Sequence, residues 1–220
     1  MKIAILTEGD GEFKSLPQLY EQLHDKMPNR TRIVKTLKIS VQPDAEHGQL
    51  VAACRPNLAL ARAVADRIIV LLDREQQQQC PGGVAQQLED EFKKIAKVPV
   101  QVVLKNRMYE NWLLADLDAL RSQPARFAVD AAAQRKICPN KADSIDGLRE
   151  IKRLVKNGDY SKTSDSDKIC RKANVEKMAA NSRSFRHFLH AVGHESYRDV
   201  CRLPAQLAQT TGPKKRRGRA

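Results

Sequence analysis

The chain lacks a hydrophobic run long enough to cross a bilayer, and its cysteines are not paired in sequence. A membrane-spanning helix needs about 20 apolar residues in succession, whereas the opening segment MKIAILTEGD already contains two acidic residues. No C-x-x-C pair occurs among the five cysteines, which are Cys54, Cys80, Cys138, Cys170 and Cys201. These absences lead us to expect a cytoplasmic protein with reduced thiols.

Two familiar glycine motifs are also missing. No G-K-[ST] follows the glycines of T-E-G-D-G-E, so that segment is not a P-loop, and it lacks the third glycine of a dinucleotide-binding fingerprint. Aromatic residues make up only 5% of the chain, but 41% of its residues are hydrophobic, which is typical of a globular protein. A length of 220 residues suits one principal domain with an appended lobe.

The net charge of +13 is unevenly distributed along the chain. Residues 1–120 carry 16 Lys and Arg against 16 Asp and Glu, whereas residues 121–220 carry 23 against 10. This asymmetry suits a surface that binds a polyanion beside an acidic, metal-binding site. A solubilising surface with a disordered basic tail is the simpler alternative.

Apolar runs alternate with amphipathic segments in the first half of the chain. We predict strands at 2–7, 32–41, 67–72 and 98–104, helices at 13–27, 58–66 and 84–97, and a loop at 42–55. After residue 109 only helices are expected, near 111–121, 145–156, 165–180 and 183–193. The pattern predicts an α/β core with a mainly parallel sheet at 1–120, a basic helical lobe at 121–209, and a disordered tail at 210–220.

Carboxylates follow three of the predicted strands. Glu8 comes after the first strand, Asp73 and Glu75 after the third, and Glu110 shortly after the fourth. Ligands bind at the carboxyl ends of the strands of an open parallel sheet, so these side chains can share one rim. Oxygen ligands of this kind select Mg²⁺ or Mn²⁺. For Asp73 and Glu75 alone, a solvated turn after the strand is an equally plausible interpretation.

These motifs together resemble a known fold. Glu-Gly after the first strand, an acidic pair after a later strand, and E-N-W-L-L-A-D at 110–116 resemble the Toprim fold. They resemble more closely an uncharacterised bacterial Toprim-like family related to the nuclease domains of overcoming-lysogenization-defect (OLD) proteins. Y-S-K at 160–162 and S-R-S-F-R-H-F-L at 182–189 match the C-terminal pattern of that family.

The resemblance implies metal-dependent phosphodiester chemistry on DNA or RNA. It makes Glu8 the general acid or base, and it implies a set of Mg²⁺ or Mn²⁺ ligands: Asp73, Glu75, Glu110, Asp116 and Glu12. Glu75 stands where the family has a second aspartate, so the metal geometry can differ here. Relatives of this kind are often found beside an ABC-class ATPase in anti-phage defence modules, which implies such a partner.

The basic half supplies candidate contacts to nucleic acid. Each one taken singly is more simply a solvated surface charge, but as a set they would neutralise several phosphates and make binding sensitive to salt. These residues are Lys141, Lys152, Lys162, Lys168, Arg171, Lys172, Arg183 and Arg186.

Several other residues admit a structural interpretation. His187, His190 and His194 share one helix face, but nothing fixes a fourth zinc ligand. Trp112 and Tyr109 are expected to pack in the core. Two alternatives to a nuclease stay open: a non-catalytic basic adaptor for nucleic acid or protein, and a flavodoxin-like nucleotide-binding domain, which the crowding of carboxylates disfavours.

Overall fold

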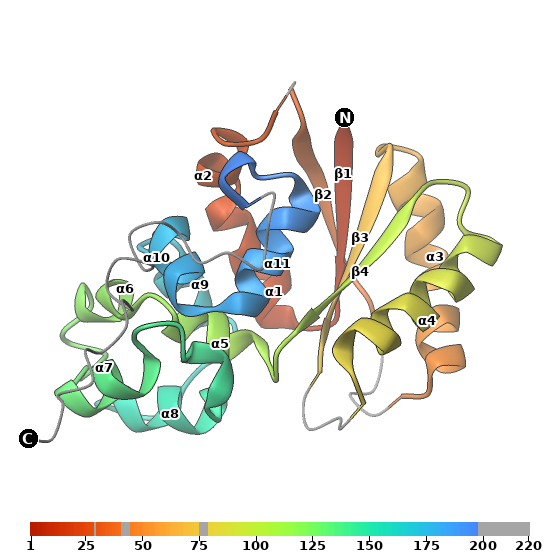
Figure 1. The fold of residues 1–220 in the computed structure, drawn as a ribbon. Helices are drawn as coiled ribbons and strands as arrows, with labels where there is room; N and C mark the ends of the chain where they lie inside the picture. Colours follow the sequence, from red (N-terminus) through yellow and green to blue (C-terminus); the bar gives the residue numbers. More distant parts are fainter. Residues whose placement is uncertain (29, 41–44, 75–78, 198–220) are drawn as a thin grey trace, which may run out of the picture.

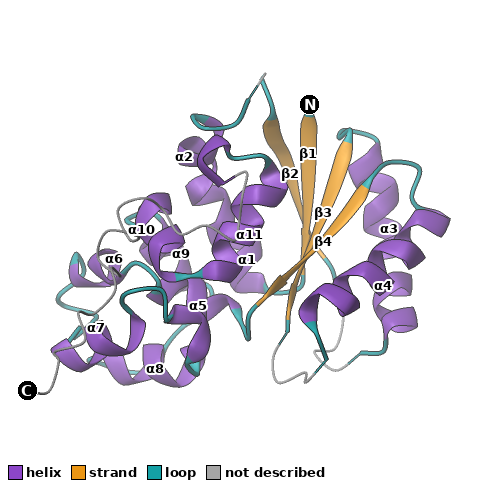
Figure 2. Ribbon diagram, in the orientation of Figure 1, coloured by secondary structure: helices purple, strands orange, loops and turns teal. Residues whose placement is uncertain are grey.

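A parallel four-stranded sheet forms the centre of the molecule. In the computed structural model, which describes residues 1–28, 30–40, 45–74 and 79–197, the strands are β1 (Lys2–Thr7), β2 (Arg32–Lys38), β3 (Arg67–Asp73) and β4 (Val100–Lys105). Their order is β2-β1-β3-β4 and every pairing is parallel (Figures 1 and 2). The predicted α/β fold with a parallel sheet flanked by helices is therefore confirmed.

One face of the sheet is covered by α3 (His47–Arg62) and α4 (Pro81–Ile95), which lie together on one side of the strands (Figure 1). Leu6, Val70 and Val102 point to this face and are almost completely buried against a cluster that includes Leu88 and Phe92. Alternate residues of the same strands point the other way, as the two-residue period of a strand requires.

The opposite face packs against the remaining helices. The chain leaves β1 through α1 (Asp10–Ser15), the 3-10 turn η1 (Leu16–Leu19) and α2 (Tyr20–His24), and α11 (Arg183–Val192) lies beside β4. Ile5 and Leu71 on the sheet belong to the same apolar cluster as Trp112, Phe185 and Phe188. The predicted helical lobe and the sheet thus share one continuous core across the expected boundary at 120.

Regular secondary structure in the described part of the C-terminal half is helical, apart from one antiparallel bridge between Phe127 and Val155. It contains α5 (Tyr109–Leu114), α6 (Leu117–Arg121), α7 (Ala131–Ile137), η2 (Ala142–Ser144), α8 (Gly147–Leu154), α9 (Ser164–Cys170), α10 (Val175–Asn181), α11 and η3 (Glu195–Tyr197). Short polar side chains cap several of these helices by accepting a backbone N–H, which explains how such short helices begin. The caps are Asp116, Asp130, Asp146, Asn174 and Ser182.

Helix α3 corrects the prediction of a loop at 42–55. The helix begins at His47 and continues through Pro56, with Val51, Cys54 and Leu58 buried at helical spacing. Proline removes one helical hydrogen bond, but Pro56 lies on the exposed side, where water can satisfy the freed carbonyl. Helix α7 was not predicted at all, and the expected tail at 210–220 lies outside the described residues.

Within the ranges that the structure describes, no helix has the length and apolar character that a bilayer crossing requires.

Candidate active site

Acidic and basic side chains meet where the strands end. Asp73 is the last residue of β3 and lies beside Lys105, the last residue of β4. Glu8 follows β1 directly, and its carboxylate accepts a hydrogen bond from the backbone N–H of Asp73. The parallel register therefore brings Asp73 and Lys105, which follow Glu8 by 65 and 97 positions in the chain, to the same rim. The argument from strand ends predicts such a meeting.

Lys105 is the centre of this cluster. Its side chain is completely buried, and its ammonium contacts Glu12 Oε1, lies 3.0 Å from Asp73 Oδ1 and 3.9 Å from Glu8 Oε1. The Nζ atom also lies 5.8 Å from the centre of the Tyr109 ring. The three carboxylates raise the pKa of Lys105 above its usual value and outweigh the opposing effect of burial, so the ammonium stays charged.

Glu12 lies at the bottom of the cluster, on α1. It is 2% exposed, and burial raises the pKa of its carboxyl to about 8, although the Lys105 ammonium opposes the shift. Its second oxygen, Oε2, is buried without a hydrogen-bond partner among the described residues. Gly9 allows this carboxylate to approach the backbone, since a Cβ at that position would stand 3.2 Å from Glu12 Oε1.

Glu110 closes the cluster from the first turn of α5. It is 4% exposed, and burial raises the pKa of its carboxyl, with Lys162 opposing and Asp73 adding to the shift. The neighbouring Tyr109 hydroxyl forms a 2.7 Å hydrogen bond with Ser15 Oγ, which fixes α5 against α1. Tyr109 is 4% exposed, so the prediction that it packs in the core agrees with its position.

Solvent reaches only some of the carboxylates in this cluster. The side chains of Glu8 and Asp73 are 14% and 22% exposed, whereas those of Glu12 and Lys105 are sealed beneath them. A ligand arriving at the rim would therefore meet two carboxylates first, with a fixed positive charge directly behind them.

Not every predicted ligand joins this cluster. Asp116 is 2% exposed and caps α6, accepting N–H groups from Asp118 at 3.1 Å and Asn174 at 2.8 Å. Both of its oxygens are occupied by backbone donors within the helical half, so its place in the E-x-W-x-x-x-D motif reflects helix capping. Glu75 lies outside the described residues.

The carboxylates of this cluster provide only some of the ligands that a cation such as Mg²⁺ or Mn²⁺ needs. Among residues 1–28, 30–40, 45–74 and 79–197, no three His, Cys, Asp or Glu side chains are grouped to hold a metal ion. Glu12 is sealed beneath the rim against the Lys105 ammonium, which leaves Glu8 and Asp73 as the accessible pair. Two carboxylates suffice for Mg²⁺, which in proteins keeps several waters and shares substrate phosphates.

The predicted nucleic-acid contacts are scattered. Arg186 is 2% exposed, and its guanidinium donates to Ala179 O and to Asn140 Oδ1 at 2.9 Å, so it supports the core and does not meet phosphate. Arg171 pairs with Asp167 at 2.8 Å. The remaining candidates are exposed: Lys141, Lys152, Lys162, Lys168, Lys172 and Arg183.

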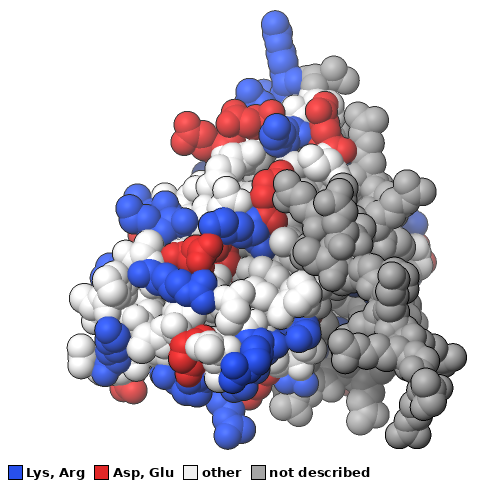
Figure 3. Space-filling view, turned by 60° about the vertical axis from the view of Figure 1, so that its left-hand side comes forward, with Lys and Arg blue, Asp and Glu red and all other residues white. Residues whose placement is uncertain are grey.

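The helical half does not present one uniform basic surface. Figure 3 shows Lys and Arg interspersed with Asp and Glu on the side that it displays. Arg126 pairs with Asp165 at 2.6 Å, and Arg153 pairs with Asp130 at 2.8 Å. In the described part of the helical half, six Lys or Arg side chains pair in this way with Asp or Glu.

The aromatic and histidine predictions agree with packing. Trp112 is fully buried, donates its indole N–H to Ser184 Oγ at 2.8 Å, and meets the Phe185 ring edge-on. His194 is 1% exposed, and His190 Nδ1 donates to the Tyr197 carbonyl oxygen, 3.1 Å away. Cys201 lies outside the described residues.

Sequence reasoning missed Lys105. We expected the strand to end at Leu104, and the lysine that follows was not among the predicted site residues. A signal was present, because Lys105 ends a strongly apolar run at the same sheet edge as Glu8 and Asp73.

A family model for a domain of unknown function, DUF4276, matches residues 7–193. The chain belongs to the DUF4276 family. The match covers Glu8, Glu12, Asp73, Lys105 and Glu110, and it extends through α11, so the carboxylate cluster and most of the shared core lie within the DUF4276 domain. No curated protein and no solved structure matches the chain.

Proposed function

We propose that this DUF4276 protein hydrolyses phosphodiester bonds of nucleic acid with the help of Mg²⁺ or Mn²⁺ held at the carboxyl edge of its sheet. The observation that carries the proposal is the convergence of Glu8, Glu12 and Asp73 on the buried ammonium of Lys105. Charged groups concentrated at a strand-end rim are costly to bury and are typical of functional sites.

Each residue has a role in this proposal. Asp73 and Glu8 are accessible and would hold the cation, which would supply charge neutralisation at the scissile phosphate. Glu8 also stands where a proton can be accepted from an attacking water. Lys105 contributes a fixed positive charge that needs no reorganisation as negative charge develops on the phosphate.

Glu12 and Tyr109 position the ammonium. Glu12 contacts Lys105 Nζ, and Tyr109 places its ring 5.8 Å from the same atom. Burial and the negative charge of Asp73 raise the pKa of the Glu110 carboxyl, so its protonation would change the net charge of the rim. The resemblance to nucleases of anti-phage modules further leads us to propose an ATPase partner that controls the activity.

A non-catalytic adaptor is the second candidate, and one observation favours it. The ammonium of Lys105 already occupies the centre of the acidic cluster, as a structural counter-ion would. In that case the cluster would stabilise the fold, and nucleic acid or a partner protein would bind elsewhere on the surface.

Cleavage assays with matched variants separate the two. Purified protein is incubated with plasmid, single-stranded DNA and transfer RNA under Mg²⁺, Mn²⁺ or EDTA, alone and with any ATPase that co-purifies. Glu8→Gln and Asp73→Asn test the rim. Asp90→Asn is the control, since Asp90 is an exposed carboxylate on α4 that pairs only with its helix neighbours.

Metal-dependent cutting that disappears in Glu8→Gln and Asp73→Asn but persists in Asp90→Asn would support the nuclease. Removing a residue that acts on the transition state typically lowers rates by ~10²-fold or more. If folded wild-type protein binds nucleic acid but cuts none of the panel in any metal, and both rim variants bind equally well, the adaptor is the better description.

A further inference from the structure

A second feature adjoins the carboxylate cluster: a cavity of about 660 Å³. Arg74, which follows Asp73, and Asn106, which follows Lys105, form one wall of it. The start of α4, the start of α11 and the segment around η2 form the others, through Cys80, Pro81, Gly82 and Ala85, through Arg183, Ser184 and His187, and through Asn140, Asp143 and Ser144. The cavity therefore opens beside the rim at which chemistry is proposed.

The charged groups of the cavity favour an anion. Arg74 donates to Asn106 Oδ1 at 3.2 Å and to the Gln79 carbonyl at 3.1 Å, while its Nε is buried with no hydrogen-bond partner in the described chain. Arg183 is exposed and forms no ion pair with any residue that the structure describes.

The single acidic residue among those lining the cavity does not neutralise the arginines. Asp143 accepts hydrogen bonds from Ser182 Oγ at 2.7 Å and from the backbone N–H of Ser184 at 2.7 Å, so its oxygens are directed to the beginning of α11. Two guanidinium groups are left facing the cavity without a carboxylate of their own.

Backbone groups at the beginning of α4 add to the positive field. This helix has 15 residues, and its first turn contains Gly82 and Gly83, each with open space where a Cβ would stand. The same two amides lower the pKa of the neighbouring Cys80 thiol. These N–H groups already donate to the Cys80 sulfur, so they contribute the positive end of the helix dipole to the field around an anion and not free hydrogen bonds.

The remaining walls suit a flat, partly apolar group. Leu104, Ala85 and Pro81 supply apolar surface, and His187 supplies a planar ring whose pKa burial lowers. Guanidinium planes and planar rings are the usual partners of unstacked bases in single-stranded nucleic acid. The volume lies within the ~300–1,000 Å³ of small-molecule sites, enough for one nucleotide and far too small for a duplex.

We propose that this cavity binds one unstacked nucleotide of a single-stranded nucleic acid, next to the phosphate that lies at the carboxylate rim. Arg74 and Arg183 hold the phosphate of that nucleotide, and its base lies against Leu104 and Ala85. The inference rests on the proposed function for the position of the scissile bond, and it adds a substrate class, single-stranded over duplex.

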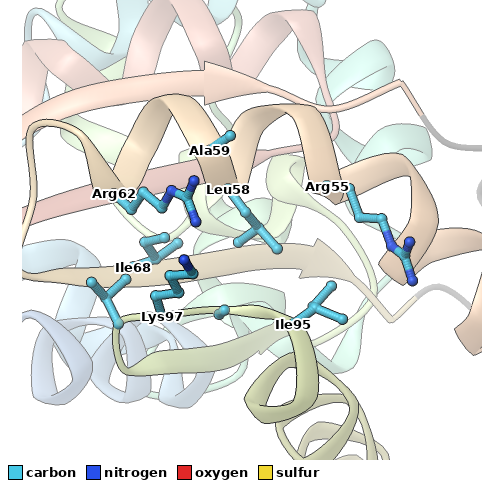
Figure 4. Close-up of a pocket in the computed structure, with 9 residues that line it drawn as sticks. Arg55, Leu58, Ala59, Arg62, Ile68, Ile95 and Lys97 are labelled. Carbon is cyan, nitrogen blue, oxygen red and sulfur yellow. The ribbon is translucent and has the colours of Figure 1, made fainter.

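Another basic cavity provides a matched control. It has a volume of about 310 Å³ and lies between α3 and the end of α4, near the beginning of β3. The charged ends of Arg62 and Lys97 turn toward each other over Leu58 and Ile68 (Figure 4). Neutralising Arg62 removes the same charge from the protein as neutralising Arg183, but at the far end of the sheet.

The test is the affinity for a short fluorescein-labelled single-stranded oligonucleotide, measured by anisotropy in EDTA so that cleavage does not interfere. Arg74→Gln and Arg183→Gln remove the phosphate contacts. Ala85→Leu fills the cavity without changing charge, and Arg62→Gln is the control. Circular dichroism and thermal melting establish that each variant is folded before its affinity is compared.

We expect Arg74→Gln and Arg183→Gln each to weaken binding about 10-fold or more, as loss of a charged hydrogen bond does. Ala85→Leu should weaken it comparably, Arg62→Gln should change it less than about twofold, and unlabelled duplex should compete poorly. Equal loss in Arg62→Gln and Arg183→Gln would overturn the proposal, as would equal competition by duplex or no binding by wild-type protein.

This outcome is distinguishable from failure of the proposed function. Oligonucleotide binding that depends on Arg183 and Ala85, with no cleavage in any metal, would refute the nuclease and keep the nucleotide site. Cleavage that depends on Asp73, with affinity unchanged in Arg183→Gln and Ala85→Leu, would refute the nucleotide site alone.

Discussion

Replacing Lys105 by methionine tests whether its ammonium holds the carboxylate cluster together. Methionine has a similar length and volume, so the substitution removes the charge and leaves the space filled. Glu12, Asp73 and Glu8 then face one another without a counter-ion, and Glu12 and Lys105 are 2% and 0% exposed. Removing one partner of a buried ion pair typically costs about 3–5 kcal/mol of folding free energy.

The structure supports a value in that range. At an effective dielectric constant of ~20, two unit charges 3.0 Å apart, the Lys105–Asp73 separation, attract by roughly 5 kcal/mol before desolvation is counted. Burial of the ammonium offsets much of this attraction. Adding Asp73→Asn to Lys105→Met should recover part of the loss, with an interaction energy of about 1–3 kcal/mol, because one uncompensated carboxylate disappears.

Urea unfolding at pH 7 measures these changes through the fluorescence of Trp112, which is the only tryptophan and is fully buried. Lys93→Met is the control, since Lys93 is exposed and pairs only with Asp90 on its own helix. If Lys105→Met unfolds within about 1 kcal/mol of the wild-type protein, the ammonium is not what neutralises the cluster, and the reasoning fails.

Three further predictions concern titration, backbone packing and salt. The pKa of Glu12 is raised from 4.5 to about 8, so between these pH values the folded state holds a proton that the unfolded state has lost. The free energy of unfolding should therefore fall as pH rises from about 4.5 to 8. Glu12→Gln should remove that pH dependence. Gly11→Ala should cost about 1–3 kcal/mol, because a Cβ there would stand 2.6 Å from the Lys162 carbonyl oxygen. Oligonucleotide affinity should fall with salt by roughly 0.7 log units per log unit of salt, the slope for the one phosphate held by Arg74 and Arg183.

Each of these predictions has a control and a contradicting result. The pH series compares urea midpoints of wild-type and Glu12→Gln protein, and parallel curves would show that Glu12 does not titrate in this window. Gly48→Ala in α3 should be neutral or stabilising, since no atom lies within 4 Å of a Cβ there; an equal loss at both glycines would contradict the packing argument. A flat salt dependence would contradict phosphate binding by arginine.

The sheet was predictable because its strands are apolar, β-branched runs that end at polar residues. The predicted span of β1, 2–7, agrees with the structure, and β3 and β4 differ from prediction by one or two residues at their ends. Pro56 misled the prediction for α3, since a breaker on the exposed side of a helix costs less than the pattern rule assumes. In α7, three consecutive alanines gave no amphipathic period to detect.

The sequence predicts only those parts of the site that depend on where the strands end. Glu8, Asp73 and Glu110 come together because parallel strands finish at one edge, which the order of elements reveals. Asp116 lies apart from the cluster, because a motif gives a residue's place in the chain, while hydrogen bonds from Asn174 and Asp118 decide where its side chain points. The position of Lys105 among the carboxylates could not be predicted from the sequence, since only the register of the strands in the structure shows it.

The shared core has a consequence for synthesis of the protein. Strand β4 is complete at Lys105, but α11, which covers it, begins only at Arg183. At ~5–20 residues per second the ribosome needs roughly 4–16 s to make the intervening chain, during which that apolar face meets water or a chaperone. This face of the sheet is therefore covered in the cell only after α11 has been synthesised.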